Sequence, residues 1–410
     1  MHQNRTPTPL GLSLRCGKRP LVLSVLAVLT LGGCAQMPAD RASQNIRGGY
    51  AAGDKVTVLL PSKGPIADVA DAVRAGVRAA HGADDTAAKP ALEFTDVGQP
   101  AKVPEVLTAA VKAGTTHAIG PIQKPAVDAL AGGSAVTIPT LALNQSTRDG
   151  KPPANLFQFA LSPETEAVEA ANRARAMGFQ RALMLYPAGD AGKRRADAFR
   201  SKWQQLGGTL AAESGFDPAA KDYAKTVTKL LGSQADFLFL SADAAQARKI
   251  YPLVRRGAAT LPVIATSEVY PGDADRARDK DLTGLYFVDL PWVLGIGAAQ
   301  DPLARAKLRA GAPYLSTPLG LRLYAMGIDA YRLAPRLTTL AKTPGAVFPG
   351  ETGTLSLDSL GRVQRQLALG QFTENGPQPV LAQTQGQGAS WMSRLTSAPA
   401  PKAEPRKAAP

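Results

Sequence analysis

The stretch Val56-Thr-Val-Leu-Leu-Pro-Ser-Lys-Gly64 and the residues that follow it decide the fold class of this 410-residue chain. Its first five residues form a short, mainly apolar run that Pro61 ends, which predicts a buried strand followed by a loop. Ile66, Val69 and Val73 then recur at the spacing of one helix face, so the next segment is predicted to be an amphipathic helix. A buried strand that leads through a loop into such a helix is typical of a parallel α/β sheet.

The same alternation of short apolar runs and helical segments continues along most of the chain. Ser162-Pro-Glu-Thr-Glu166 marks one helix start, with an N-cap serine, a proline at the first position and acids in the first turn. We therefore predict an α/β protein with two lobes, each a doubly wound, mainly parallel sheet, and a hairpin near the end. Strands are expected at 92–96, 117–120, 140–144, 157–159, 182–186, 236–241, 263–266 and 285–289, late helices at 303–308 and 319–333, and the hairpin at 353–357 and 362–372.

Domain boundaries follow from composition and from breaks in this alternation. Lys151-Pro-Pro153 is the expected first passage between two lobes that the chain enters twice. Residues 54–382 are predicted to form the two-lobed domain, between a flexible tether at 34–53 and a disordered tail at 383–410. At ~3.4 Å per residue, such a tether spans at most ~65 Å. Lobe 1 is expected to comprise about 54–155 and 284–345, and lobe 2 about 156–283 and 346–382.

Residues 1–33 have the pattern of a cleaved secretory signal peptide. Four positive residues precede an apolar run at 21–31, which is too short for a permanent membrane-spanning helix. Leu31-Gly-Gly-Cys34 follows and resembles the bacterial lipobox, in which the cysteine is lipidated and the peptide is cut before it. Cys34 is therefore the predicted lipid site, against the alternative of an ordinary cleaved signal with an incidental cysteine. Because Ala35 rather than Asp follows, we expect sorting to the outer membrane of a Gram-negative envelope, facing the periplasm.

Cysteine content and charge narrow the function classes. Cys16 lies in the signal and Cys34 would carry lipid, so the mature domain has no thiol for a disulfide, a metal or nucleophilic catalysis. The formal net charge of +14 includes four positive charges of the signal, which leaves a basic mature chain. A periplasmic address argues against nucleic acid as a partner. Anionic lipid, lipopolysaccharide or cell-wall carboxylates fit a basic surface better, and an ordinary solvated surface fits equally well.

The sequence carries no recognisable catalytic or metal-binding pattern. His81 and His117 are the only histidines outside the signal, and neither has a second ligand at metal-binding spacing. The Gly-x-Ser-x-Gly elbow of hydrolases is missing. Gly189-Asp-Ala-Gly-Lys-Arg194 lacks the spacing of a phosphate-binding loop, so we interpret it as a turn and helix start. The prediction is a protein that is not an enzyme and needs neither a cofactor nor a metal.

Polar residues at the carboxyl ends of the predicted strands are the candidates for a ligand site. In an open α/β sheet, loops and helix N-termini converge there, so a small molecule in a cleft between two lobes would meet them. The alternative is that they are ordinary turn and cap residues, and the sequence does not separate the two. The candidate cleft residues are Ser62, Lys63, Gly120, Gln123, Asn144, Tyr186, Glu268 and Tyr270.

Several segments of the chain resemble those of a known family. The two-lobed layout is similar to that of type I periplasmic binding proteins, and the segments resemble the LppC-type lipoproteins more specifically. Single segments are weak signals, but their order and spacing over about residues 54–382 are fairly specific. The segments are 58–65 with 73–76, 119–121, 139–144, 161–164, 192–194 with Ala198, Phe199 and Trp203, 282–285, 289–292, 323–330 and 353–362.

The resemblance implies a non-enzymatic outer-membrane lipoprotein that regulates cell-wall synthesis. Such a protein would bind a class A penicillin-binding protein, which is a bifunctional peptidoglycan synthase, and stimulate its transpeptidase. The resemblance implies no catalytic residue and no established small-molecule ligand. The competing class is a lipid-anchored periplasmic solute receptor that closes on an amino-acid-like ligand. Its cleft would need an acid for the ammonium group, and Glu268 is the only candidate that the sequence offers.

Overall fold

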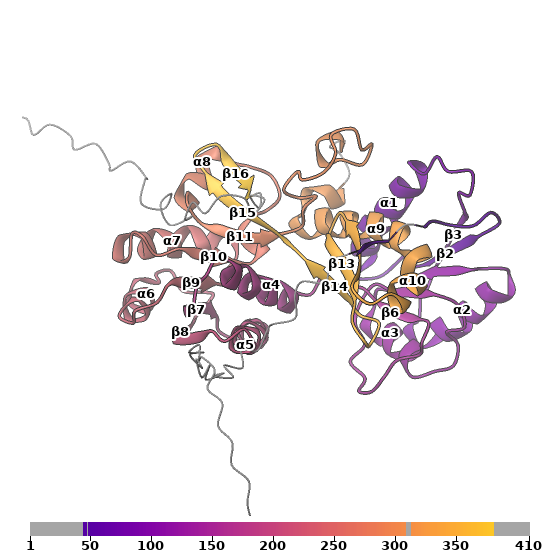
Figure 1. Ribbon diagram of the computed structural model, residues 1–410, viewed down its shortest axis with the longest axis horizontal. Helices are drawn as coiled ribbons and strands as arrows, with labels where there is room; N and C mark the ends of the chain where they lie inside the picture. The colour runs from indigo at the N-terminus through magenta and orange to yellow at the C-terminus, as the bar shows by residue number, and fades with distance from the viewer. Residues whose placement is uncertain (1–43, 47, 309–312, 381–410) are drawn as a thin grey trace, which may run out of the picture. The chain divides into compact units, whose positions relative to one another are not determined.

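The computed structural model describes residues 44–46, 48–308 and 313–380, which form three β-sheets with helices packed against them (Figure 1). The predicted signal at 1–33, the lipid site Cys34, the first part of the tether and the tail from residue 383 lie outside the described residues. Among the described residues, none of the helices combines the length and the apolar content that crossing a bilayer requires.

The first sheet has five parallel strands in the spatial order β3 (Ala91–Thr95), β2 (Lys55–Leu59), β4 (His117–Ile119), β5 (Thr140–Ala142) and β6 (Leu156–Gln158). The chain starts inside the sheet at β2, moves outward to β3, and returns to the other side of β2 at β4. This order is that of a doubly wound sheet. The carboxyl ends of β2 and β4 therefore meet at the switch point, where such sheets bind ligands.

Helices cover both faces of this sheet, because alternate residues of β2 are buried on opposite sides. The helices are α1 (Ala67–Gly82) and α9 (Pro318–Leu333) on one face, and α2 (Val103–Lys112) and α3 (Lys124–Ala131) on the other. Val58 packs in the first apolar cluster and Leu59 in the second. Glycines bring α1 and α9 into contact, since a Cβ at Gly76 would lie 2.0 Å from the carbonyl oxygen of Tyr324.

The second sheet has seven strands in the order β16 (Gly376–Pro379), β15 (Ala368–Thr373), β11 (Tyr286–Asp289), β10 (Val263–Ala265), β9 (Phe237–Leu240), β7 (Arg181–Pro187) and β8 (Thr209–Phe216). Strands β7 to β11 are parallel and β15 and β16 antiparallel. Phe199 stacks on Phe239 with ring centroids 4.1 Å apart. The helices of this half are α4 (Pro163–Ala176), α5 (Asp190–Gln205), α6 (Ala224–Leu231), α7 (Ala244–Gly257) and α8 (Arg276–Asp279).

A third sheet is absent from the sequence predictions. Its four strands are β1 (Gln44–Asn45), β12 (Ala346–Gly350), β13 (Gly353–Leu357) and β14 (Val363–Gln366), and α10 (Leu337–Lys342) leads into β12. The predicted hairpin supplies β13 and β14, which pair antiparallel, whereas β1 pairs parallel with β12.

The described end of the predicted tether packs on the domain, which differs from the expectation of a free segment. Its strand β1 belongs to the third sheet. Farther along, the hydroxyl of Tyr50 donates a hydrogen bond of 2.7 Å to the carbonyl oxygen of Tyr331, and its ring meets His117 edge-on. The physical reason is that Ile46 and Tyr50 bring apolar surface that packs against the core of the domain.

Other details also differ from the sequence predictions. The edge strand β8 is missing from them, because it is only partly buried and its residues have weak β-propensity. The helix expected at 303–308 is only the 3₁₀ turn η4 (Arg305–Lys307). The remaining 3₁₀ turns are η1 (Pro100–Lys102), η2 (Ser267–Val269), η3 (Lys280–Leu282), η5 (Pro313–Ser316) and η6 (Ala334–Arg336).

The sheets also divide the chain differently from the expected lobe boundaries. β6 follows residue 155 but belongs to the first sheet, and β11 follows residue 284 but belongs to the second. β11 belongs to the second sheet because it pairs in parallel with β10 and so extends the parallel part of that sheet. The α/β class with mainly parallel sheets is confirmed, and the division into two lobes stays a prediction.

The described chain enters or leaves the second sheet at three places, which we call the crossings. The first follows β6 and leads into α4, and the second leads from β11 to α9. The third is Leu367 alone, which separates β14 of the third sheet from β15 of the second (Figure 1).

Candidate functional site

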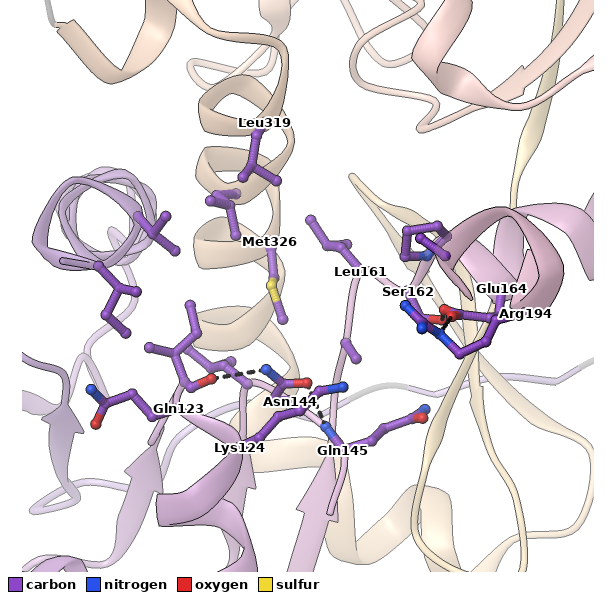
Figure 2. Close-up of a pocket in the computed structure, with 18 of the residues that line it drawn as sticks. Gln123, Lys124, Asn144, Gln145, Leu161, Ser162, Glu164, Arg194, Leu319 and Met326 are labelled. Carbon is purple, nitrogen blue, oxygen red and sulfur yellow. Dashed lines mark hydrogen bonds and ion pairs between the residues drawn. The ribbon is translucent and has the colours of Figure 1, made fainter. Parts of the chain in front are cut away.

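A cavity of about 880 Å³ lies among the carboxyl ends of the first sheet, the start of α4 and α5, and α9 (Figure 2). We call it the cleft. Loops after β4 and β5 form one wall, and the N-terminal turns of α4 and α5 form the opposite wall. Its size and its place at the ends of parallel strands are those of a small-molecule site in this class of fold.

The wall after β4 and β5 is built from amide side chains. Asn144 donates a hydrogen bond of 3.0 Å from Nδ2 to the carbonyl oxygen of Ile122, and its Oδ1 accepts one from the backbone N–H of Gln145. Asn144 therefore joins the loop after β4 to the end of β5. Both the nitrogen and the oxygen of its side-chain amide are engaged in these hydrogen bonds. Gln123 differs, because its Oε1 is buried without a hydrogen-bond partner among the described residues.

The opposite wall carries charged residues that pair with each other. The Nε of Arg194 lies 3.0 Å from a carboxylate oxygen of Glu164, and Arg195 pairs with Glu268. Ser162 caps α4 by accepting from the N–H of Thr165, and its hydroxyl also donates to Glu164 at 2.7 Å. Two arginines therefore face two carboxylates, so this wall has little net charge of its own.

The two carboxylates of this wall have pKa values shifted in opposite directions. Burial acts to raise the pKa of Glu164, but the hydrogen bonds from Ser162 and Arg194 lower it overall. Burial raises the pKa of Glu268, and the attraction of Arg195 only partly opposes that shift.

Apolar side chains complete the cleft. Leu319, Leu323 and Met326 come from α9, and Ile66 and Val69 come from the segment that leads into α1 and from its first turn. Leu319 has 53% of its surface exposed, although most residues of its helix, α9, are buried. An occupant of the cleft would therefore contact an apolar wall along with the amides and the ion pairs.

Only some of the sequence-predicted cleft residues line the cavity. Gln123, Asn144 and Glu268 do, while the other five do not. Ser62 is held by Asp96, which accepts from its N–H at 2.9 Å and from its hydroxyl at 2.6 Å. Tyr270 is buried, and its hydroxyl donates to the carbonyl oxygen of Gly272.

The remaining three predicted residues also lie off the cavity. Gly120 has a φ of +100° and packs against β2, where a Cβ would approach the carbonyl oxygen of Leu59 to 2.2 Å. Lys63 is exposed, and Tyr186 is half-buried near the end of β7. The structure thus brings together three of the eight candidates, and whether any of them binds a ligand stays a prediction.

Several residues that line the cleft are missing from the sequence prediction. Their positions give partial signals, because Ser162 and Glu164 open a helix with cap chemistry, and Arg194 follows the Gly189 turn. Each pattern indicates a helix start, and only the fold shows that two such starts face the same cavity. The missed polar residues are Lys124, Ser162, Glu164, Arg194 and Arg195.

The cleft has no catalytic constellation. Its polar groups are amides, one capping hydroxyl, paired charges and the amine of Lys124, and neither His81 nor His117 lines it. Within the described ranges, no group of three or more His, Cys, Asp or Glu side chains is placed to hold a metal ion. Burial lowers the pKa of His117, which lies at the opposite end of β4. The arrangement fits binding by contact better than it fits acid–base or metal chemistry.

Comparison with known protein families identifies the chain at this point. The family model described as "LppC putative lipoprotein" matches residues 51–375. The chain belongs to the LppC lipoprotein family. The match covers the first sheet, the second sheet except its edge strand β16, the cleft and all three crossings of this LppC-family chain.

A curated relative of this LppC-family chain is the "Penicillin-binding protein activator LpoA" of Edwardsiella ictaluri (strain 93-146). It is 30% identical in an alignment of 319 positions that covers 68% of this chain and 45% of the relative. The chain spans about half the length of the curated relatives it matches.

Solved structures with the same fold include both members of the family and transport proteins. The structure named "LpoA (YraM) C-domain from Haemophilus influenzae, a regulator of PBP1A" superposes with a TM-score of 0.67 at 24% identity, covering 80% of this chain and all of that one. A "putative branched-chain amino acid ABC transporter" from Chromobacterium violaceum superposes with a TM-score of 0.64 at 32% identity, covering 78% of this chain and 99% of that one. The LppC-family fold is therefore shared with a protein named as an amino acid transporter.

Proposed function

We propose that the mature domain is a non-enzymatic activator that binds a class A penicillin-binding protein and stimulates its peptidoglycan crosslinking. The observation that carries the proposal is the 30% identity to a penicillin-binding protein activator across 68% of this chain. The chemistry of the cleft agrees with a role without catalysis, since its arginines pair with its acids and its one lining hydroxyl, that of Ser162, caps α4.

The partner should bind to the outer surface of the domain rather than inside the cleft. A stable contact between folded proteins buries about 800 Å² on each partner, whereas a cavity of about 880 Å³ fits a small molecule. Because the mature chain is basic, electrostatic attraction to an acidic partner surface should speed recruitment. Binding should then weaken as ionic strength rises.

A crosslinking assay with purified synthase tests this proposal. The domain, added without lipid, is expected to raise the crosslinked fraction of new peptidoglycan made by a class A synthase of the same organism. Variants of the cleft residues Asn144 and Glu268 should stimulate as well as the parent chain. Failure to stimulate any class A synthase of that organism would contradict the proposal.

We infer that Cys34 anchors the protein to the outer membrane, on the periplasmic side. The lipobox pattern at 31–34 and membership of a lipoprotein family support this inference. Cys34→Ser is expected to leave the protein in the periplasm, or unprocessed at the inner membrane. Membrane fractionation provides the readout, and an unchanged outer-membrane signal in that variant would exclude anchoring through this residue.

A solute receptor is the second candidate function, and one observation favours it. The 32% identity to a protein named as part of a branched-chain amino acid transporter extends over 99% of that protein. The cleft offers Arg195 and Glu268 for the two charges of an amino acid and Leu319 for an apolar side chain. A rise in melting temperature with a single amino acid would support the receptor, because a ligand that binds only the folded state stabilises it.

A further inference from the structure

Six buried charged residues lie where the chain crosses between the sheets, outside the cleft. Four are acids and two are arginines, so the group has more negative than positive side chains. We call it the charge cluster. Its members are Glu166 and Glu169 of α4, Asp289 of β11, Arg322 and Asp329 of α9, and Arg365 of β14.

One of the two arginines is fully paired. Arg322 donates from Nε to Asp289 at 3.0 Å and from Nη2 to the second oxygen of Asp289 at 2.5 Å. Its Nη2 also lies 3.2 Å from the carbonyl oxygen of Ser267 and 3.0 Å from that of Tyr270. These bonds attach α9, on the first sheet, to two strand ends of the second sheet, so they fix the second crossing.

The other acids already accept hydrogen bonds from neutral donors. Glu166 accepts from the N–H and the hydroxyl of Ser267, at 3.0 and 2.9 Å. Asp329 accepts from the N–H groups of Glu351 and Thr352, both at 2.7 Å. Burial raises the pKa of both acids, since these donors replace water only in part.

The third crossing is attached to α4 at a single residue. Glu169 accepts from the N–H of Leu367 at 3.1 Å, and Arg173 donates to the carbonyl oxygen of the same residue. Both bonds come from side chains one helical turn apart on α4. Leu367, the single residue between β14 and β15, is therefore bound to α4 on both its N–H and its carbonyl side.

Arg365 lies two residues before Leu367 and is not paired. It is only 3% exposed, and its Nε, Nη1 and Nη2 are all buried without a hydrogen-bond partner among the described residues. Glu166 and Glu169 are the acids that attract it most strongly, although neither is within ion-pair distance. A buried guanidinium without a partner is unfavourable, because it has lost its water and gained no hydrogen bond in return.

We propose that Arg365 is the latch of a two-state joint at the third crossing, and that in the second state β14 turns about Leu367 so that the guanidinium hydrogen-bonds to the carboxylates of Glu166 and Glu169. In the state described above, the third sheet is held without this bond. In the second state, the bond forms and the two large sheets change their relative angle. Two arrangements of one packed joint, each with its own set of hydrogen bonds, form a bistable element.

Distances between spin labels on the two sheets test the joint in the full chain. The sequence has only Cys16 and Cys34, so replacing both by serine leaves the chain ready for two introduced cysteines. Lys112 of α2 and Lys229 of α6 are exposed and carry the labels. The expected result is two distance populations, whose ratio changes about tenfold in Arg365→Met, because a charge-assisted hydrogen bond is lost from one state.

Two further variants keep the test decisive. Arg365→Lys retains the charge but loses the planar fork, so it should shift the ratio in the same direction even if the methionine variant folds poorly. Arg362→Met is the matched control, because it removes a nearby arginine that pairs with Asp358 at the surface, and it should leave the ratio unchanged. A single distance in the parent chain, or a ratio that neither Arg365 variant changes, would overturn the proposal and assign the buried guanidinium to internal water alone.

Discussion

The cleft and the charge cluster are both built from arginines and carboxylates, yet water reaches only the first. In the cleft, Arg194 and Glu268 keep much of their surface exposed, so their ion pairs can exchange with solvent or a ligand. In the charge cluster, Arg322 and Asp289 are almost fully buried, and neither can leave its partner without stranding a charge. An arginine–carboxylate pair can therefore exchange its partner for solvent or a ligand in the cleft. In the charge cluster the same kind of pair fixes the packing of α9 against β11.

Breaking the buried pair should have the largest effect. Arg322→Met leaves Asp289 charged, buried and without its main partner, so the free energy of unfolding should fall by about 3–5 kcal/mol. Urea denaturation of the variant and the parent chain measures the difference. Arg362→Met, which breaks the half-exposed pair with Asp358, serves as the control and should cost less than about 1 kcal/mol. Equal losses in the two variants would remove the distinction between the regions.

The next largest effect should be a pH-dependent fall in the free energy of unfolding, on the order of 2–3 kcal/mol, which a pH titration measures. Burial and the neighbouring Asp329 raise the pKa of Glu351 from 4.5 to about 7. The folded state then binds a proton that the unfolded state releases, so stability from this group is present below pH ~4.5 and is lost as pH rises towards ~7. Glu351→Gln should therefore flatten the decline in stability across that window.

The cleft acid Glu164 supplies the control with the opposite sign. Its pKa is lowered overall, so its contribution is present above the unfolded pKa and is lost as pH falls. Glu164→Gln should leave the window from pH ~4.5 to ~7 unchanged. A parent chain whose stability does not fall across that window would contradict the assignment of Glu351.

Asn144→Ala should have an intermediate effect on stability, about 1 kcal/mol. The substitution removes the hydrogen bond to the carbonyl oxygen of Ile122, and water in the open cleft replaces it in part. Stimulation of the synthase should stay within twofold of the parent chain. Thermal denaturation and the crosslinking assay check the two parts, and a large loss of stimulation with normal stability would place the partner at the cleft.

Arg194→Ala should have the smallest effect, less than about 1 kcal/mol. Its pair with Glu164 is exposed to solvent, so water and salt compensate for its loss. The difference from the parent chain should shrink further at high salt. Denaturation at low and high ionic strength measures both values, and a loss as large as that of Arg322→Met would show that the cleft pairs are structural.

The fold could be predicted from the sequence where pattern and burial agree. Val56 to Leu60 form a continuous apolar run, α1 has apolar residues at helical spacing, and the alternation of such segments indicates a mainly parallel α/β sheet. The third sheet could not be predicted, because β1 pairs with β12, and Gln44 and its partner Ala346 lie far apart in the sequence. Local pattern contains no information about such a pairing.

The cleft could be predicted only in part for the same reason. Asn144 and Gln123 follow strands of one sheet, so the strand-end rule finds them. Arg194 and Arg195 come from a helix of the other half, and only the fold places them opposite. Arg365 did have a signal, because it alternates with Val363 and Leu367 on the buried face of its strand. A charged residue at an apolar position of a strand indicates a buried charge, for which a partner is expected nearby.

The pairing of β1 with β12 also limits how far the domain could move from a lipid on Cys34. Because Gln44 is held on the domain, ten residue steps separate it from Cys34. At ~3.4 Å per step, those residues span at most ~34 Å, about half the length that a free tether to residue 53 would allow. A lipid on Cys34 would then confine the domain to a thin layer beside the membrane. Such confinement raises its local concentration towards any partner that extends into the same layer.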